Sequence, residues 1–221
     1  MLALVSAGMM SPRPVAVRTR DESAAKNLLE GLRFVRGDPT TLTLISLQAI
    51  PALLIMPYQQ LLPIFARDIL HTGPEGLGLL TMAVGIGAIL GAIGAVTLPP
   101  HRQKLSLLVA LTVFGLLLAV FAASRWLPLS IALMGLIGVT QAVYLATNNT
   151  LVLLATSDAM RGRVMSIYLM TWGLIPIGSL PQGILAERFG APPVVAGCGL
   201  LSCAIVAILA LRVSALRQLR D

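Results

Sequence analysis

Hydrophobic residues in this chain gather into six long runs that contain almost no charge, separated by short polar segments. A helix that crosses a bilayer needs about 20 predominantly apolar residues, and each run supplies that length. An outer-membrane barrel would instead show roughly 10-residue strands of alternating polarity, so the runs are expected to be helices. The pattern predicts an all-α integral membrane protein with six transmembrane helices. The runs lie at about 41–66, 76–98, 105–123, 129–156, 164–185 and 193–211.

The charged residues, 16 Lys or Arg and 9 Asp or Glu, all lie outside these runs. They make up 11% of the 221 residues, whereas a typical soluble domain carries about 25%. This small charged fraction excludes a soluble domain. Thirteen of the 16 basic residues fall in the segments that alternating spans place on one side of the membrane. The positive-inside rule therefore predicts that both termini are cytoplasmic, and the net charge of +7 indicates topology rather than a nucleic-acid partner.

The segment before the first run divides into three parts. Met1–Met10 is apolar but too short to cross a membrane, which is typical of the end of a longer span. Ser11–Glu22 has the composition of a linker. Ser23–Arg36 carries an apolar stripe at helical spacing, so we expect an amphipathic helix at the membrane surface. The expected domains are a cytoplasmic segment at 1–40, a six-helix bundle at 41–212 and a cytoplasmic tail at 213–221.

The six runs repeat their character in two sets of three. The first and fourth runs are the polar ones, the second and fifth are rich in Gly or Pro, and the third and sixth are almost purely apolar. Two matching units with an odd number of spans must have opposite topology, which is the inverted-repeat arrangement of secondary transporters. The sequence therefore predicts two inverted three-helix repeats whose first helices line a cavity.

Polar side chains in the runs recur on particular helix faces. Gln48 and Gln59 are eleven residues apart, about three turns, so they are expected to share a face. An amide in lipid is unfavourable unless it finds a partner or water. Two interpretations remain open, because such amides either bond a neighbouring helix or line a cavity, and their occurrence on two matched helices favours the cavity. The residues assigned to the substrate cavity are Gln48, Gln59, Gln141, Tyr144, Asn148 and Trp172.

Small residues in the second run indicate a helix contact. Gly87, Gly91 and Gly94 form a stripe that lets another helix approach closely. Pro176 and Pro181 give the fifth run a comparable helix-weakening character. We expect these five residues to lie at helix-packing interfaces.

A charged cluster stands in the loop after the fourth run. Asp158, Arg161 and Arg163 either form a latch at a cytoplasmic gate or serve as a local cap with positive-inside anchoring. The runs themselves contain no Asp, Glu, Lys, Arg or His, and no cluster of metal-ligating residues occurs. The sequence therefore predicts no catalytic residue, no metal and no cofactor. A membrane enzyme is not expected.

Three segments resemble the second half of transporters of the major facilitator superfamily. They are Glu30-Gly-Leu-Arg33-Phe-Val-Arg36, Asp158-Ala-Met-Arg161-Gly-Arg163 and Gly183-Ile-Leu-Ala-Glu-Arg188-Phe-Gly. The similarity is greatest to bacterial permeases grouped with the enterobactin exporter and macrolide-efflux proteins. The resemblance implies helices seven to twelve of a twelve-helix protein, with the first and fourth spans on the substrate path. It also implies that the second and fifth spans meet the other bundle.

The expected function is therefore efflux of small amphipathic molecules, such as drugs or siderophores, by alternating access in the bacterial inner membrane. The resemblance implies proton antiport, with the coupling group in the missing half. The expected partners are the lipid bilayer, a small-molecule substrate, and either an N-terminal half, missing or separately encoded, or a second copy of this chain. The alternative is a truncated remnant or a self-pairing six-helix protein without transport activity.

Overall fold

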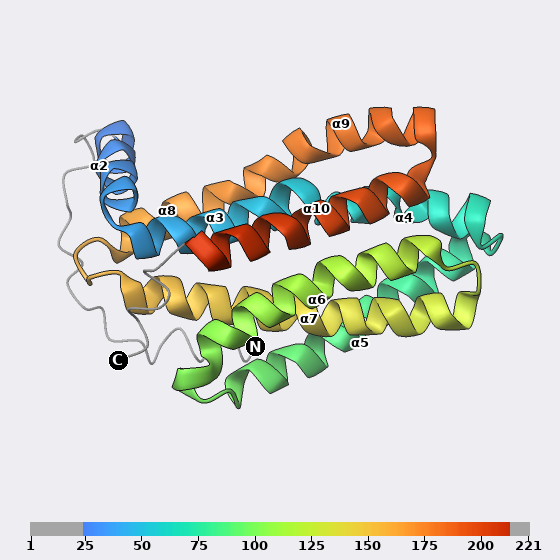
Figure 1. Cartoon of the computed structure of the whole chain (residues 1–221), viewed down its shortest axis with the longest axis horizontal. Helices are drawn as coiled ribbons and strands as arrows, with labels where there is room; N and C mark the ends of the chain where they lie inside the picture. The colour runs from blue at the N-terminus through green and yellow to red at the C-terminus, as the bar shows by residue number, and fades with distance from the viewer. Residues whose placement is uncertain (1–23, 213–221) are drawn as a thin grey trace, which may run out of the picture.

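The computed structural model describes residues 24–212, and the side chains of residues 29–210, as a bundle of long helices (Figure 1). Within these residues, six helical segments are long and apolar enough to cross a membrane. The predicted all-α fold with six spans is thereby confirmed. The predicted Met1–Met10, Ser11–Glu22 and the tail at 213–221 lie outside the described residues. The six segments are Pro39–Ile69, Gly73–Val96, Pro100–Ala123, Leu127–Ala155, Arg161–Phe189 and Ala191–Ala210.

The first span is interrupted, where the sequence predicted one continuous helix. It consists of α3 (Pro39–Leu54), α4 (Tyr58–Ile64) and the π-helical turn η1 (Phe65–Ile69). The Asp38 side chain accepts a hydrogen bond of 2.8 Å from the Thr41 backbone N–H and so caps α3. The helix then ends ahead of Pro57, which has no N–H to continue the ladder. Proline inside a span thus divides it into two helices.

The fifth span is also divided. It runs as α8 (Arg161–Met170), the 3₁₀ turn η3 (Thr171–Gly173) and α9 (Leu174–Phe189). Pro176 follows the turn and lacks the N–H that would bond the Trp172 carbonyl in a continuous helix. The other long helices are α5 (Gly73–Val96), α6 (Gln103–Ala123), α7 (Leu127–Ala155) and α10 (Ala191–Arg212), with the 3₁₀ turn η2 (Pro100–Arg102) ahead of α6.

Glycine brings several pairs of helices into backbone contact, and two of these pairs are α5 with α7 and α6 with α10. A Cβ built on Gly87 of α5 would lie 1.9 Å from the Gly135 carbonyl oxygen of α7. A Cβ on Gly115 of α6 would lie 2.6 Å from the Gly199 carbonyl oxygen of α10. Neither contact leaves room for a side chain, so α5 packs on α7 and α6 packs on α10 at small-residue sites.

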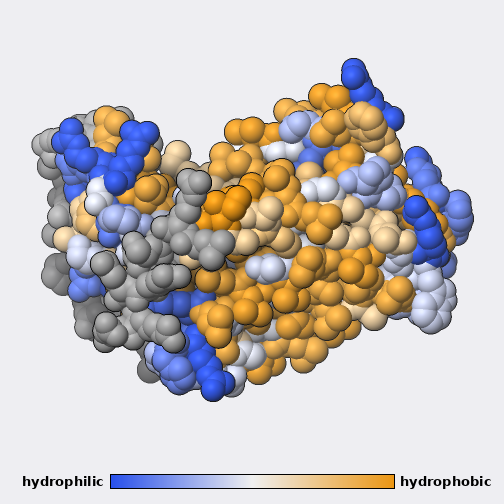
Figure 2. All heavy atoms as spheres, in the orientation of Figure 1, coloured by the Kyte–Doolittle hydropathy of each residue, from blue (hydrophilic) through white to orange (hydrophobic). Residues whose placement is uncertain are grey.

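The outer surface of the bundle is apolar between two polar ends. Figure 2 shows a band of hydrophobic residues over the middle of the helices, with hydrophilic residues gathered at either end. Large apolar side chains are exposed along α5 and α9, which a water-soluble protein of this size rarely allows. The chain is a multi-pass membrane protein. The exposed apolar residues of these two helices include Met82, Ile86, Ile89, Ile93, Ile177, Leu180, Ile184 and Phe189.

A short helix, α2 (Ala24–Gly37), crosses one end of the bundle (Figure 1). It coincides closely with the amphipathic helix expected at Ser23–Arg36. Val35 is buried against the bundle, and a Cβ built on Gly31 would lie 3.3 Å from the Arg163 carbonyl oxygen of α8. Leu29 and Leu32, however, are exposed. One part of the expected apolar stripe therefore packs on the bundle, and the other part is exposed. A location of α2 at the membrane surface stays a prediction.

Candidate functional site

Three predicted cavity residues form one hydrogen-bonded group, which we call the polar cluster: Gln48, Tyr144 and Asn148. The Tyr144 hydroxyl donates to Gln48 Oε1, and Asn148 Nδ2 donates to the same oxygen over 3.3 Å. Asn148 Nδ2 also donates to the Leu44 carbonyl over 3.3 Å. The polar cluster thus joins α3 to α7, with the amide oxygen of Gln48 as its shared acceptor.

The polar cluster is shielded inside the bundle. Gln48 is 2% exposed, and Tyr144 and Asn148 are 0% exposed. Tyr168 of α8 is also buried. This geometry supports the interpretation in which the amides bond a neighbouring helix. A role for these three residues in lining a substrate cavity stays a prediction.

Gln59 lies apart from the polar cluster. It is exposed, whereas Gln48 is buried, and the helix on which a shared face was expected is broken between them, so the shared face stays a prediction. The eleven-residue spacing assumed an unbroken helix. The turn at Ile55–Pro57 separates α3 from α4 and changes the rotation of the residues that follow it.

The other two predicted cavity residues lie close to the helix interruptions. Gln141 is half-buried, and its Nε2 donates to Met56 Sδ at 3.5 Å, within the turn of the first span. Trp172 belongs to η3 and is 42% exposed. Gln59 and Trp172 are therefore the two predicted cavity residues that are exposed in the described bundle, and a role for them in lining a cavity stays a prediction.

The predicted helix-packing residues fall into two groups. Gly87 and Gly91 lie against the α7 backbone, with a built Cβ on Gly91 2.4 Å from the Val139 carbonyl oxygen, whereas Gly94 has nothing within 4 Å. This contact is internal to the six-helix unit. Pro176 and Pro181 are exposed on α9, where they are free of close packing in the described residues.

The charged cluster after the fourth span makes contacts within this chain. Arg161 pairs with Asp158 over 2.8 Å, three residues away, and also donates to the Leu153 carbonyl over 3.4 Å. Arg163 pairs with Glu30 of α2 over 2.8 Å. The first pair is a local contact between side chains and does not cap α8, whose N-cap residue Met160 makes no side-chain hydrogen bond. The second pair ties α2 to α8. A latch at a cytoplasmic gate stays a prediction.

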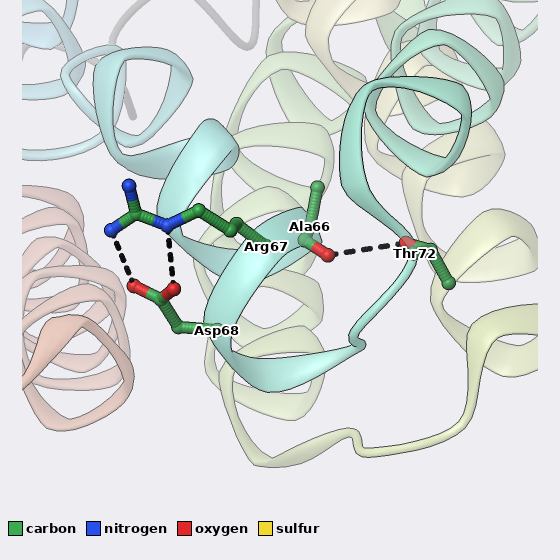
Figure 3. A network of polar contacts seen from close by, with 4 residues as sticks. All are labelled: Ala66, Arg67, Asp68 and Thr72. Atoms are coloured by element: carbon green, nitrogen blue, oxygen red, sulfur yellow. Dashed lines mark hydrogen bonds and ion pairs between the residues drawn. The ribbon is translucent and has the colours of Figure 1, made fainter.

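The first span ends in an ion pair that the sequence reasoning did not single out. Arg67 Nε donates to Asp68 Oδ1 over 2.6 Å, and Arg67 Nη2 donates to Asp68 Oδ2 over 3.0 Å (Figure 3). The Thr72 hydroxyl bonds the Ala66 carbonyl over 3.2 Å. Adjacent opposite charges directly after an apolar run were the available signal, and together these bonds complete the end of the helix.

A second missed contact joins the first span to the fifth. Gln182 of α9 is 4% exposed and its Nε2 donates to the Leu53 and Leu54 carbonyls of α3, each over 3.1 Å. The signals available in the sequence were the amide of Gln182 in the fifth apolar run and Pro57 in the first. Only the folded arrangement shows that they belong together.

A bundle of six spanning helices with interrupted first and fifth spans has the architecture of a membrane transporter. The chain belongs to a family of the major facilitator superfamily described as transmembrane secretion effectors, which matches residues 2–220. It is accordingly a transporter protein and not an enzyme.

Two relatives carry the name multidrug efflux pump Tap. The protein from Mycolicibacterium fortuitum is 28% identical over 172 residues, which cover 76% of this chain and 42% of the relative. The protein from Mycobacterium tuberculosis (strain ATCC 25618 / H37Rv) is 27% identical over 206 residues, 91% of this chain and 48% of the relative. The chain thus spans about half the length of the curated relatives that it matches.

Proposed function

We propose that this chain is the C-terminal half of an efflux transporter that exports small amphipathic molecules, such as drugs or siderophores, by alternating access. The observation that carries the proposal is a complete six-span unit that matches about half of relatives named as multidrug efflux pumps. Inverted repeats and interrupted helices near the bilayer midplane are the usual construction of secondary transporters. The membrane is the bacterial inner membrane, with both termini on the cytoplasmic side.

The substrate path is formed by neutral side chains at the interruptions. Gln59 is exposed close to the interruption of the first span, and Trp172 is exposed at the interruption of the fifth. Gln141 bonds Met56 in the turn of the first span. An aromatic ring and amides among apolar side chains suit a ligand that has both an apolar body and a polar group. The polar cluster fixes α3 to α7.

The partner is a six-helix N-terminal half, encoded with this chain or separately. α5 is the least buried of the six spans, and its exposed face is almost wholly apolar. In a transporter of two bundles, part of this face and of the α9 face would be covered by the other half. A second copy of this chain is the alternative occupant, and the experiment below distinguishes the two.

Proton coupling would depend on a carboxyl group in the other half. Among the described residues, the acidic side chains lie at the ends of the spans or in α2, and none lies near a span centre. An ionisable group that alternates between protonated and charged states must lie on the transport path. This half would then supply neutral walls and conformational change.

The test combines assembly with transport. The chain is produced together with a six-helix N-terminal half, its subunit composition is measured by native mass spectrometry in nanodiscs, and export of a fluorescent drug is followed in inverted membrane vesicles. We expect a one-to-one complex that exports, with export lowered several-fold by Trp172→Ala or Gln59→Leu. Leu200→Ala, at an exposed position on α10, is the matched control and should export normally.

Two results would overturn the proposal of an efflux transporter, and a third would overturn its substrate path. A stable homodimer without export, or a complex that never exports, would favour the self-pairing protein or the remnant. Normal export by both Trp172→Ala and Gln59→Leu would exclude the assigned substrate path.

A further inference from the structure

The interruption of the first span leaves several carbonyl groups without their usual partners, and two of them belong to Leu53 and Leu54. In a continuous helix the Leu53 carbonyl would accept from residue 57, but Pro57 has no N–H. The Leu54 carbonyl would accept from the Tyr58 N–H, which instead donates to the Ile55 carbonyl over 3.0 Å. In the interior of a membrane, unsatisfied backbone groups of this kind are strongly unfavourable.

One side chain from another span supplies the missing donor. Gln182 Nε2 lies 3.1 Å from each of the two carbonyl oxygens. Its own oxygen, Oε1, is buried and has no hydrogen-bond partner among the described residues. The two hydrogen bonds that the amide donates to α3 therefore fix its orientation, because its oxygen accepts none among the described residues.

A glycine one turn earlier on α9 makes this contact sterically possible. A Cβ built on Gly178 would lie 2.1 Å from the Leu53 carbonyl oxygen. Residues four apart on a helix lie on the same face, so Gly178 and Gln182 form one surface against the end of α3. Gly178 lets the backbones meet, and Gln182 bonds the carbonyls exposed there.

We propose that Gln182 is a positioning residue that holds the interruption of the first span and thereby sets the orientation of α4. The effect on transport rests on the function proposed above, because Gln59 of α4 lies on the proposed substrate path. Gln182 itself is buried. Losing its amide would let the turn at Ile55–Pro57 open and α4 change its orientation, so the two carbonyls act as the fixed point of a hinge between α3 and α4.

The first experiment needs no transport activity. Amide hydrogen exchange is measured on the full chain in nanodiscs, and the peptide covering residues 53–61 is compared with the one covering 39–50. Gln182→Met keeps the length of the side chain but removes the donor, so exchange of the Tyr58 and Gln59 amides should accelerate ~10-fold. Ser179→Ala is the matched control, because the Ser179 hydroxyl bonds only carbonyls of its own helix and exchange should be unchanged.

A second variant returns the missing donor to the backbone. Pro57→Ala gives residue 57 an N–H that can bond the Leu53 carbonyl. In Pro57→Ala/Gln182→Met, exchange around the turn should therefore fall back most of the way to the wild-type rate. Unchanged exchange in folded Gln182→Met overturns the proposal, and so does fast exchange that persists in the double variant. If Gln182→Met does not fold alone, recovery of a folded protein by adding Pro57→Ala supports it.

The transport readout tests whether the positioning of α4 affects export. In a complete transporter, Gln182→Met should lower kcat/KM several-fold, because a reoriented α4 displaces Gln59 from the proposed substrate path, whereas Ser179→Ala should leave kcat/KM unchanged. Unchanged kcat/KM in Gln182→Met would overturn the link between the positioning role and transport. If wild-type protein shows no export but exchange follows the expected pattern, the function proposed above fails while the structural role of Gln182 stands.

Discussion

The first and fourth spans open the two halves of the polarity repeat, yet they are built differently. The fourth span is a single helix of 29 residues, α7, held through backbone contacts with α5 at glycine. The first span is interrupted after Leu54, and side-chain amides from α7 and α9 reach its turn. The two spans therefore share a polar character but differ in construction. The fourth is one rigid helix, and the first contains a hinge.

This difference indicates how an alternating-access unit could divide its tasks. Glycine contacts are made by backbone against backbone and leave little freedom to slide. Hydrogen bonds from side chains to freed carbonyls can be exchanged for others at small cost during a movement. We expect α7 with α5 to act as the fixed frame and α4 as the element that changes orientation.

The largest expected effect comes from disturbing the glycine contact of the fixed frame. Gly87→Ala places a Cβ 1.9 Å from the Gly135 carbonyl oxygen, so α5 and α7 must separate. Overpacking of this kind typically costs about 1–3 kcal/mol, and contact with rigid backbone puts this site at about 3 kcal/mol. The measurement is the free energy of unfolding in mixed detergent micelles.

Its control lies two residues away on the same helix. Gly85 has nothing within 4 Å of a built Cβ, so Gly85→Ala should change stability by less than about 0.5 kcal/mol. Equal destabilisation by both variants would mean that α5 and α7 are not held at this contact.

A smaller effect is expected at the polar cluster, with a definite order among its members. Gln48→Leu leaves the Tyr144 hydroxyl and one Asn148 bond without their shared acceptor, which should cost about 2 kcal/mol. Tyr144→Phe removes one donor while Asn148 still bonds Gln48, so about 1 kcal/mol is expected. Unfolding measurements that reversed this order would contradict the assignment of Gln48 Oε1 as the shared acceptor.

Particular residues show what the sequence could and could not predict. Hydropathy located all six spans, because length and uniform apolarity are local properties of the chain. The exposure of Gln59 could not be predicted, because helical arithmetic holds only while the helix is unbroken. The three prolines of the first span, Pro51, Pro57 and Pro63, do not by themselves show which one interrupts it. The pairing of Gln182 with Leu53 spans 129 residues, and no local pattern encodes it.

The same limit applies to the polar cluster. Gln141, Tyr144 and Asn148 stand at i, i+3 and i+7 in the sequence, and all three bond residues of the first span. The spacing could not indicate what these side chains meet. The structure shows that Gln48 of α3 fills the position opposite Tyr144 and Asn148, so polarity alone does not separate a cavity wall from a helix contact.

A third prediction concerns accessibility rather than stability. Pro57→Ala should allow α3 to continue into α4, and eleven residues of unbroken helix would bring position 59 to the face of Gln48. In a background with Cys198→Ala and Cys203→Ala, a thiol introduced by Gln59→Cys should react several-fold more slowly with a water-soluble maleimide once Pro57→Ala is added. Gln60→Cys is the control for general changes in labelling. Unchanged reactivity at position 59 would mean that Pro57 does not cause the interruption.

The smallest effect is expected where the fourth span reaches the turn of the first. Gln141 donates to Met56 Sδ over 3.5 Å, which is a weak bond, and its Oε1 is buried without a partner among the described residues. Gln141→Leu removes a weak bond and an unsatisfied polar atom together, so the free energy of unfolding should change by less than about 0.5 kcal/mol. In a complete transporter the same variant tests the substrate path directly. Lower export or altered specificity at unchanged stability would assign Gln141 to the substrate, whereas a loss of stability comparable to that of Gln48→Leu would show that α7 supports the hinge as well as the frame.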